Sequence, residues 1–281
     1  MYNEKYALIT GASDGFGKAL ALQCASLKMN VILVALPGPE LPYLISFIQN
    51  NFGVKAVCFE KDLSEEKGCH ELFHEVKQQG LLVNVLINNA GIGNTNFFEE
   101  RETDFYQKQI RLNVMAPTIL TRLFLDDLKK TARSYILNIS SLASFFYLPK
   151  KQVYGATKSY LVAFSKSLRR ELEKDNISVS VACPAGMNTN VQVSLLNRTG
   201  NWFTRISITN PEEIAPMVIK NMLKGKELII PGLVSNFFLF LDKFLPANIK
   251  KAFTAKAIQK LKPVQKSSTS ITTIHPSPMA A

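Results

Sequence analysis

The chain has 281 residues, of which 47% are hydrophobic and 20% are charged, a composition typical of a globular protein with room for one large α/β core. Its formal net charge is +11, and residues 191–281 hold most of the excess, with 12 Lys and Arg against 4 Asp and Glu. No helix-turn-helix or RNA-binding signature accompanies this charge, so we exclude nucleic acid as a partner and favour an anionic membrane surface.

Short apolar runs alternate with stretches of helical periodicity along the chain. Strands are predicted at 5–10, 30–35, 54–59, 84–88, 134–139, 177–182 and 227–230. Helices are predicted at 16–28, 40–51, 65–78, 101–129, 153–174 and 211–224. Strands that are apolar on both faces and alternate with helices indicate a parallel sheet covered on both sides. The fold class is therefore α/β, a doubly wound sheet that binds ligands at the carboxyl ends of its strands.

A glycine-rich loop follows the first predicted strand. The sequence "TGASDGFGKAL" places Gly11, Gly15 and Gly17 in a G-x-x-x-G-x-G spacing ahead of a helix. This differs from the G-x-G-x-x-G fingerprint, but its glycines equally permit a tight turn and let the backbone approach a pyrophosphate at the helix N-terminus. The loop predicts a dinucleotide site, with a glycine-rich turn that binds no ligand as the alternative.

The helix predicted at 65–78 contains the zinc-protease signature H-E-x-x-H. His70 and His74 lie one turn apart with Glu71 between them, a spacing that can bind zinc and activate water. The apolar stripe of this helix consists of Cys69, Leu72, Phe73 and Val76. The histidines flank that stripe on a polar surface, and the remaining histidine, His275, is close to the C-terminus. We expect no metal site here, and a zinc metalloprotease is a distant alternative.

Five further motifs follow the glycine loop in a fixed order. They are "NNAG" (88–91) after the fourth predicted strand, Asn113 in the next helix, "NISS" (138–141) at the end of the fifth strand, "YGATK" (154–158), and "CPAGMNT" (183–189) at the end of the sixth strand. The series covers residues 5–230 and resembles the short-chain dehydrogenase/reductase family. The resemblance implies an NAD(P)-dependent oxidoreductase that interconverts a carbonyl and a secondary alcohol by hydride transfer. A catalytically idle dinucleotide-binding regulatory protein is the alternative.

The resemblance implies a catalytic tetrad of Asn113, Ser141, Tyr154 and Lys158. Tyr154 is the expected general acid and base. The pKa of a phenol is ordinarily about 10, and Lys158, one helical turn later on the same helix face, is expected to lower that of Tyr154. Ser141 is expected to orient the substrate carbonyl, with its neighbour Ser140 as the less favoured candidate. Asn113 is expected to hold a water that relays protons toward Lys158.

The same resemblance implies which residues contact the cofactor. They are Gly11, Ser13, Asp14, Gly15, Phe16, Gly17, Asp62, Asn89, Ala90, Gly91, Tyr154, Lys158, Pro184, Gly186 and Thr189. Asp62 is the expected adenine contact, and the segment from Pro184 to Thr189 is expected to hold the carboxamide. One departure occurs there, because Ala185 stands where the family usually has a glycine after the proline.

The end of the second predicted strand bears on the choice between NAD and NADP. An Asp or Glu there would bond the ribose 2′-hydroxyl of NAD, and a basic residue would pair with the 2′-phosphate of NADP. Residues 35–37 are Ala, Leu and Pro, so neither charge is present, and only Asp14 would weakly repel a phosphate. We therefore expect NADP to be the preferred cofactor, with NAD as the alternative.

The segment after the sixth strand is expected to select the substrate. Residues 190–210 are expected to form a lid, which favours an apolar substrate resembling a lipid, a steroid or a xenobiotic. The apolar side chains available in this lid are Leu195, Leu196, Trp202 and Phe203. Residues 233–262 are apolar and basic, and are expected to form helices that contact a membrane, the substrate pocket or a second subunit. These helices would be the last part of a single domain at 1–262. A disordered Ser/Thr/Pro-rich tail is expected at 263–281.

The N-terminal sequence and the cysteines bear on where the protein is located, and the family resemblance bears on its assembly. No basic and apolar leader precedes the first strand, so we expect no signal peptide. The four cysteines, at 24, 58, 69 and 183, form no C-x-x-C pair and are expected to be buried thiols in a reducing compartment. We expect a cytoplasmic protein, with membrane association left open, and a homo-oligomer as the family resemblance implies.

Overall fold

The structure is a computed structural model that describes residues 4–187 and 208–232. The expected helices at 233–262, the expected tail at 263–281 and Thr189 lie outside the described residues. So does nearly all of the expected lid, including Leu195, Leu196, Trp202 and Phe203.

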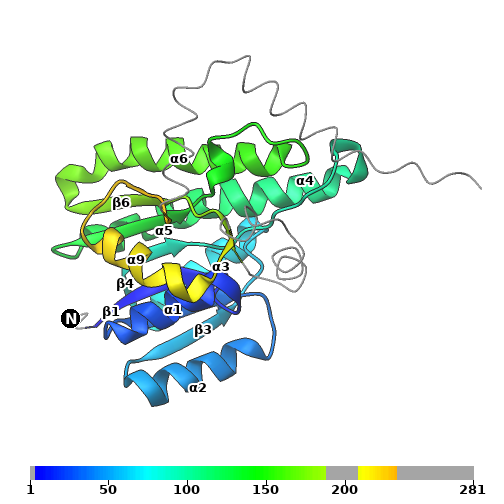
Figure 1. Ribbon diagram of the computed structural model, residues 1–281. Helices are drawn as coiled ribbons and strands as arrows, with labels where there is room; N and C mark the ends of the chain where they lie inside the picture. Colours follow the sequence, from blue (N-terminus) through cyan, green and yellow to red (C-terminus); the bar gives the residue numbers. More distant parts are fainter. Residues whose placement is uncertain (1–3, 188–207, 233–281) are drawn as a thin grey trace, which may run out of the picture. The chain divides into compact units, whose positions relative to one another are not determined.

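Seven parallel strands form one sheet in the order β3-β2-β1-β4-β5-β6-β9 (Figure 1). The strands are β1 (Lys5–Thr10), β2 (Asn30–Ala35), β3 (Ala56–Glu60), β4 (Leu82–Asn88), β5 (Ser134–Ile139), β6 (Ile177–Ala182) and β9 (Leu228–Ile229). A separate short pair, β7 (Gly186–Met187) and β8 (Ile208–Thr209), follows β6. The strand order reverses between β1 and β4, which is where a doubly wound sheet opens a crevice for ligands.

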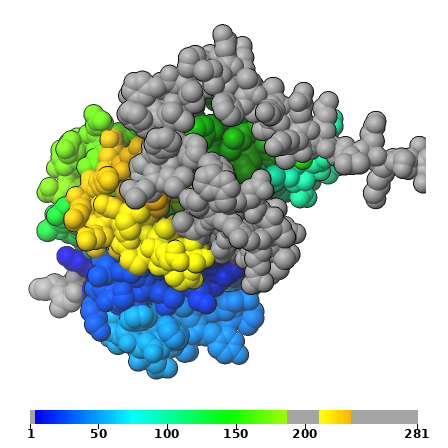
Figure 2. Space-filling model, viewed as in Figure 1, coloured from blue at the N-terminus to red at the C-terminus, as the bar shows by residue number. Residues whose placement is uncertain are grey.

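Helices cover both faces of the sheet, which confirms the predicted doubly wound α/β fold. One face carries α1 (Gly15–Ser26), α2 (Glu40–Phe52) and α9 (Pro211–Leu223), and Figure 2 shows α9 lying against α1. The other face carries α3 (Glu66–Gln78), α5 (Ala116–Lys129) and α6 (Gln152–Leu172). No helix in these described ranges is both long and apolar enough to cross a membrane.

The strands are apolar throughout because both of their faces are buried. In β1, Ala7 and Ile9 pack against the layer of α1, α2 and α9, whereas Tyr6 and Leu8 pack against α3 and α5. A strand that was solvated on one face would instead alternate apolar and polar residues. The continuous apolar runs in the sequence therefore predicted these strands to within two residues at each end.

Helix ends follow local chemistry. Pro211 opens α9, where its missing N–H and fixed φ are no disadvantage, and Glu212 and Glu213 in the first turn complement the helix dipole. Gly53 ends α2 in the left-handed conformation, with φ of +64°. The short 3₁₀ turns are η1 (Phe98–Glu100), η3 (Leu142–Ser144) and η4 (Glu173–Asp175).

The single helix predicted at 101–129 is interrupted. It consists of α4 (Thr103–Ile110), a π-helical turn η2 (Arg111–Met115) and α5, and the Ala116 N–H bonds the Arg111 carbonyl five residues back. Pro117 stands at the start of α5 and has no N–H. The carbonyl of Asn113 therefore receives no bond from the residue four positions on. Asn113 is buried within this turn, and its side chain bonds Ile92 in the loop after β4.

Candidate active site

The glycine loop connects β1 to α1 with a backbone that only glycine adopts readily. Gly11 and Gly15 have φ of +65° and +54°. A Cβ on Gly17 would overlap the Gly11 carbonyl oxygen and crowd the Asn89 amide. The loop thus leaves bare backbone at the start of α1, which fits a dinucleotide whose pyrophosphate lies against the helix N-terminus.

The loop is tied to the end of β4. The Asn89 side-chain amide donates to the carbonyls of Thr10 (2.9 Å) and Gly11 (3.2 Å). The Thr10 hydroxyl in turn accepts the backbone N–H groups of Asn89 (2.9 Å) and Ala90 (3.0 Å). These bonds hold the two loops that border the crevice in one arrangement.

The remaining expected cofactor residues lie around this loop, with different surroundings. Asp14 is exposed, Ser13 is half-buried and Phe16 is buried in the core. Asp62 accepts the N–H (2.9 Å) and hydroxyl (2.7 Å) of Ser64. Burial by itself would raise the pKa of Asp62, but the two bonds from Ser64 and the nearby Lys108 ammonium outweigh it and lower that pKa.

Tyr154 and Lys158 lie near the N-terminus of α6, as their spacing predicted. The Lys158 ammonium is 5.8 Å from the centre of the Tyr154 ring and donates to the Ile139 carbonyl (2.9 Å). Lys158 is only 4% exposed, and burial lowers its pKa to about 8. Burial also raises the pKa of the Tyr154 phenol, and the Ser141 hydroxyl, which interacts with that phenol, partly opposes the rise.

The two neighbouring serines have separate surroundings. The Ser140 hydroxyl is buried and donates to the Lys158 carbonyl (2.7 Å), so it holds α6 against the end of β5. The Ser141 hydroxyl accepts the Ala143 N–H (3.2 Å) at the start of η3 and interacts with Tyr154. The structure therefore brings Ser141, and not Ser140, to the tyrosine.

Asn113 is buried and fully paired through its side chain. Its amide donates to the Ile92 carbonyl (2.9 Å) and the Thr157 hydroxyl (3.1 Å), and its oxygen accepts the Ile92 N–H (2.9 Å). A Cβ on Gly91 would lie 3.0 Å from that oxygen and 3.3 Å from the Lys158 ammonium. Asn113 and Lys158 therefore border the same residue of the loop after β4.

The loop after β6 approaches the same edge of the sheet. The Pro184 carbonyl accepts the Leu142 N–H (2.9 Å), and Gly186 begins β7. Cys183 precedes them, and burial raises the pKa of its thiol to about 11, a rise that the nearby Ser140 and Ser144 hydroxyls partly oppose. The cysteine is therefore a neutral thiol beside the tyrosine and the lysine.

Three residues at this site were missed by the sequence-based reasoning. Lys151 places its ammonium 5.2 Å from the centre of the Tyr154 ring, and a Cβ on Gly93 would lie 3.2 Å from that ring. Glu60, at the end of β3, accepts the Gly38 N–H (3.1 Å) in the loop after β2. Lys151 lies outside the predicted helix, so none of the three residues carried a local signal.

The H-E-x-x-H helix has a different role in the structure. Glu71 pairs with Lys61 (3.4 Å) and Lys67 (3.5 Å), and the first of these contacts contributes most to lowering its pKa. His74 is exposed, and His70 lies 3.7 Å from Glu66. Within the described part of the chain, no three His, Cys, Asp or Glu side chains form a group suited to a metal ion.

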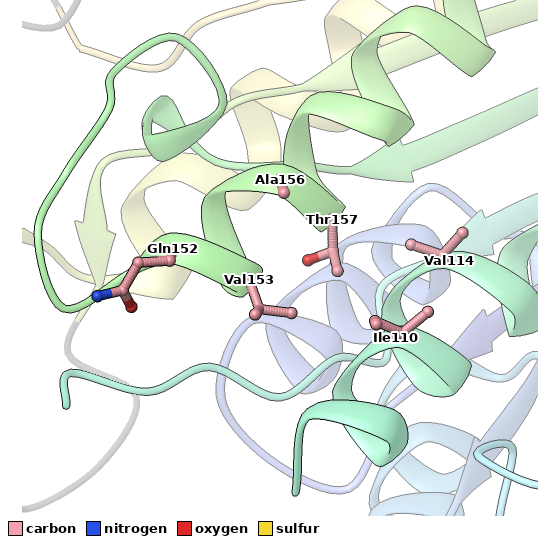
Figure 3. Close-up of a pocket in the computed structure, with 6 residues that line it drawn as sticks. All are labelled: Ile110, Val114, Gln152, Val153, Ala156 and Thr157. Atoms are coloured by element: carbon pink, nitrogen blue, oxygen red, sulfur yellow. The ribbon is translucent and has the colours of Figure 1, made fainter. Parts of the chain in front are cut away.

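An apolar groove lies between α4, η2 and α6, next to Asn113, one of the expected catalytic residues. Its volume is about 470 Å³, and Figure 3 shows Val153 and Thr157 of α6 facing Ile110 and Val114. Ile110, which lines this groove, is 43% exposed. Thr157 connects the groove to the site, because its hydroxyl bonds the Asn113 amide.

Known proteins resemble this chain along most of its length. The 3-oxoacyl-(acyl-carrier-protein) reductase FabG of Aquifex aeolicus is 28% identical over 76% of this chain and 88% of its own. Human 17-beta-hydroxysteroid dehydrogenase type 3 is 26% identical over 81% of this chain and 76% of its own. A short-chain dehydrogenase from Sphingobium yanoikuyae, solved with NADPH, matches the fold with a TM-score of 0.72 at 22% identity, over 95% of this chain and 99% of its own.

A family model described as short chain dehydrogenase matches residues 5–199. That match covers both the glycine loop and the tetrad residues, and it extends over more than half of the chain. The chain therefore belongs to the short-chain dehydrogenase family and is an NAD(P)-dependent oxidoreductase that acts on CH–OH and carbonyl groups.

Proposed function

We propose that this protein interconverts an apolar ketone and the corresponding secondary alcohol, with Tyr154 as its general acid and base. The observation that carries this proposal is the convergence of Tyr154, Ser141 and Lys158 beside a glycine loop that fits a dinucleotide. The bound nicotinamide would accept or donate the hydride, and the residues of the chain would move the proton.

Tyr154 and Lys158 are suited to proton transfer in the reducing direction. Because burial raises the pKa of Tyr154, the phenol is protonated at neutral pH and can donate to a carbonyl oxygen. The phenolate that forms is stabilised by the Lys158 ammonium, which with a pKa of about 8 is mostly charged at pH 7. In the oxidising direction the same phenolate would accept the alcohol proton.

Ser141 and Asn113 complete the proposed machinery. The Ser141 hydroxyl lies at the tyrosine and would orient the carbonyl by hydrogen bonding to its oxygen. The Asn113 side chain is occupied by Ile92 and Thr157, so its contribution to a proton-relay water would come from its backbone carbonyl. Pro117 supports this, since it leaves that carbonyl without its usual helical donor.

The test of this proposal is Tyr154→Phe. We expect turnover to fall by roughly 10² to 10⁴, because the proton donor is lost, while cofactor affinity changes little. Tyr43→Phe is the matched control, since Tyr43 is 77% exposed on α2 and its loss should leave turnover unchanged. Near-normal turnover in Tyr154→Phe would refute the assignment.

We propose NADP(H) as the preferred cofactor. Residues 35–37 carry no acid to exclude a 2′-phosphate, and a dehydrogenase of the same fold was solved with NADPH. Glu60 opposes this preference, because its carboxylate lies at the loop after β2. Glu60→Gln should therefore raise kcat/KM for NADP while leaving that for NAD unchanged, and a tenfold preference of the wild type for NAD would contradict the proposal.

We propose an apolar substrate of the lipid or steroid class. Two relatives support this class by their names, since one is a steroid dehydrogenase and the other reduces oxoacyl groups. The apolar composition of residues 190–210 gives independent support. Cofactor oxidation measured against a panel of ketones and aldehydes should give the highest kcat/KM for apolar ketones, and a preference for small polar carbonyls would contradict this.

We propose that two copies of the chain associate through the groove between α4, η2 and α6. An exposed apolar surface of this kind is typical of an interface, and it is lined by the same residues in each copy. Light scattering should give twice the mass of the chain, and Val153→Glu should give a monomer. A monomeric wild type would exclude this interface.

We propose a cytoplasmic protein with peripheral membrane contact. The four cysteines are all free, which fits a reducing compartment. The basic and apolar composition of residues 233–262 supports attraction to anionic lipid. Full-length protein should co-sediment with anionic vesicles and not with neutral ones, and absence of binding to both would refute the membrane contact.

A further inference from the structure

A second lysine lies closer to the Tyr154 ring than the lysine of the Y-x-x-x-K motif does. The Lys151 ammonium is 5.2 Å from the ring centre, against 5.8 Å for Lys158. Lys158 lies one helical turn after Tyr154 within α6, whereas Lys151 is the non-helical residue that immediately precedes α6. The tyrosine is therefore flanked by two cations.

The position of Lys151 is fixed by contacts distant in sequence. Its ammonium donates to the Asn94 carbonyl (3.3 Å) and the Thr95 hydroxyl (3.2 Å), both in the loop after β4. The Asn96 N–H also donates to the Lys150 carbonyl (3.2 Å), which holds the same loop against the start of α6. The lysine therefore spans from the helix that carries Tyr154 to the loop that borders its ring.

The charge of Lys151 is not neutralised nearby. Its two hydrogen-bond acceptors are neutral, and in the described ranges it makes no ion pair with a carboxylate. Lys151 is half-buried, and burial alone lowers its pKa, with no acid contributing. Its field is therefore screened less than that of a fully solvated surface lysine, and the Tyr154 ring lies within its reach, 5.2 Å away.

The Tyr154 ring also needs space on the loop side. A Cβ on Gly93 would come within 3.2 Å of the ring edge, so the ring packs directly on the Gly93 backbone. The bonds from Lys151 to Asn94 and Thr95 hold that backbone in place. Lys151 thus fixes both the surface that the ring packs on and the charge beside it.

We propose that Lys151 is a positioning residue that seats the Tyr154 ring against Gly93 and stabilises its phenolate as a second cation. This inference rests on the proposed role of Tyr154. The other groups near the phenol do not supply this charge. Ser141 is neutral, Cys183 is a neutral thiol below a pKa of about 11, and Lys158 is already partly deprotonated near pH 8.

The inference predicts a shift in the titration of Tyr154 itself. Removing a cation near a phenol destabilises the phenolate, so Lys151→Gln should raise the Tyr154 pKa by about one unit. The readout is tyrosinate absorbance against pH, taken as the difference between each protein and its Tyr154→Phe counterpart. In kinetics, the acid limb of kcat for alcohol oxidation should move to higher pH by the same amount, while KM for the alcohol stays within about twofold.

Two variants separate charge from structure. Lys151→Arg keeps the cation and should return the midpoint to within a few tenths of a unit of the wild type. Lys150→Gln removes the same charge one residue away, where the ammonium lies 4.2 Å from the Phe97 ring, and should leave the midpoint unchanged. If Lys151→Gln failed to fold, Lys151→Arg and Lys151→Met would provide the comparison.

Two outcomes would overturn the inference: an unmoved midpoint in Lys151→Gln, or an equal shift in Lys150→Gln. A tenfold rise in KM together with the unmoved midpoint would make Lys151 a substrate-binding residue instead. The absorbance titration needs no turnover. An inactive wild type would therefore refute the proposed function and still leave Lys151 tested, whereas an active wild type with an unmoved midpoint would refute only Lys151.

Discussion

At the scale of single residues, Lys158 combines a positive charge with nearly complete burial. Its ordinary pKa is 10.5, and burial lowers this to about 8 in the folded protein. The unfolded chain therefore binds more protons than the folded one between pH 8 and pH 10.5, so this group makes stability rise with pH across that window. Below pH 8 the folded protein carries the full cost of a buried ammonium.

Lys158→Met should therefore be inactive but more stable at pH 7. The shift from 10.5 to about 8 corresponds to about 3 kcal/mol, and the lost bond to the Ile139 carbonyl returns about 1 kcal/mol of it. We expect the free energy of unfolding of the variant to exceed that of the wild type by roughly 1 to 3 kcal/mol at pH 7. This difference should shrink between pH 8 and pH 10.5.

Urea unfolding of the cofactor-free protein at several pH values measures this gap. Lys166→Met is the matched control, because Lys166 is exposed on the same helix, and its effect should stay within about 0.5 kcal/mol at every pH. A variant that is less stable than the wild type at pH 7 would contradict the argument.

Of the two lysines beside Tyr154, the sequence predicted Lys158 but not Lys151. The spacing of Tyr154 and Lys158 predicts one helix face, and their assignment as a pair came from the ordered motifs around them. Lys151 precedes the predicted helix, and its place beside Tyr154 depends on Asn94 and Thr95, which are more than fifty residues away in the chain. Side-chain burial of that kind has no local signature.

At the scale of elements, the seven strands of the main sheet were predictable, whereas the short pair β7 and β8, the 3₁₀ turns and one π-helical turn were not. Runs such as "NVILVA" match β2 residue for residue, because burial on both faces requires continuous apolar sequence. The π-turn at Arg111–Met115 was missed within a predicted helix. Pro117 was its signal, since a proline inside a helix removes a backbone donor, but a proline can equally begin a helix.

Asn113→Ala should show how much this turn depends on one side chain. The substitution leaves the Ile92 N–H without its acceptor and removes two further bonds, so we expect a loss of roughly 2 to 3 kcal/mol in the free energy of unfolding. Asn51→Ala is the control, since Asn51 is exposed on α2 and its amide donates to the Phe47 carbonyl, and the loss should stay near 0.5 kcal/mol. Equal losses in the two variants would contradict the argument.

At the scale of the whole molecule, cofactor binding should stabilise the fold by mass action. A ligand at one hundred times its Kd adds about 2.7 kcal/mol, which corresponds to a rise of roughly 5 to 10 °C in Tm for a protein of this size. Gly17→Ala should lose this rise, because its Cβ would displace the glycine loop. Gly80→Asn, at a left-handed position with open space, should keep it.

Scanning calorimetry with and without NADPH or NADH tests this prediction. A wild type with no rise for either cofactor would contradict the assignment of the glycine loop. A full rise in Gly17→Ala would show that the loop tolerates a side chain and does not approach the ligand closely.

The bonds to Thr10 and Asn113 have a consequence for hydrogen exchange. The loop after β4 has no regular secondary structure, yet the N–H groups of Asn89 and Ala90 donate to the Thr10 hydroxyl, and that of Ile92 donates to the Asn113 amide oxygen. Amides bonded in this way exchange only when the bond opens. These three should exchange as slowly as amides in the adjoining strand, and their protection would depend on two side chains that belong to other elements.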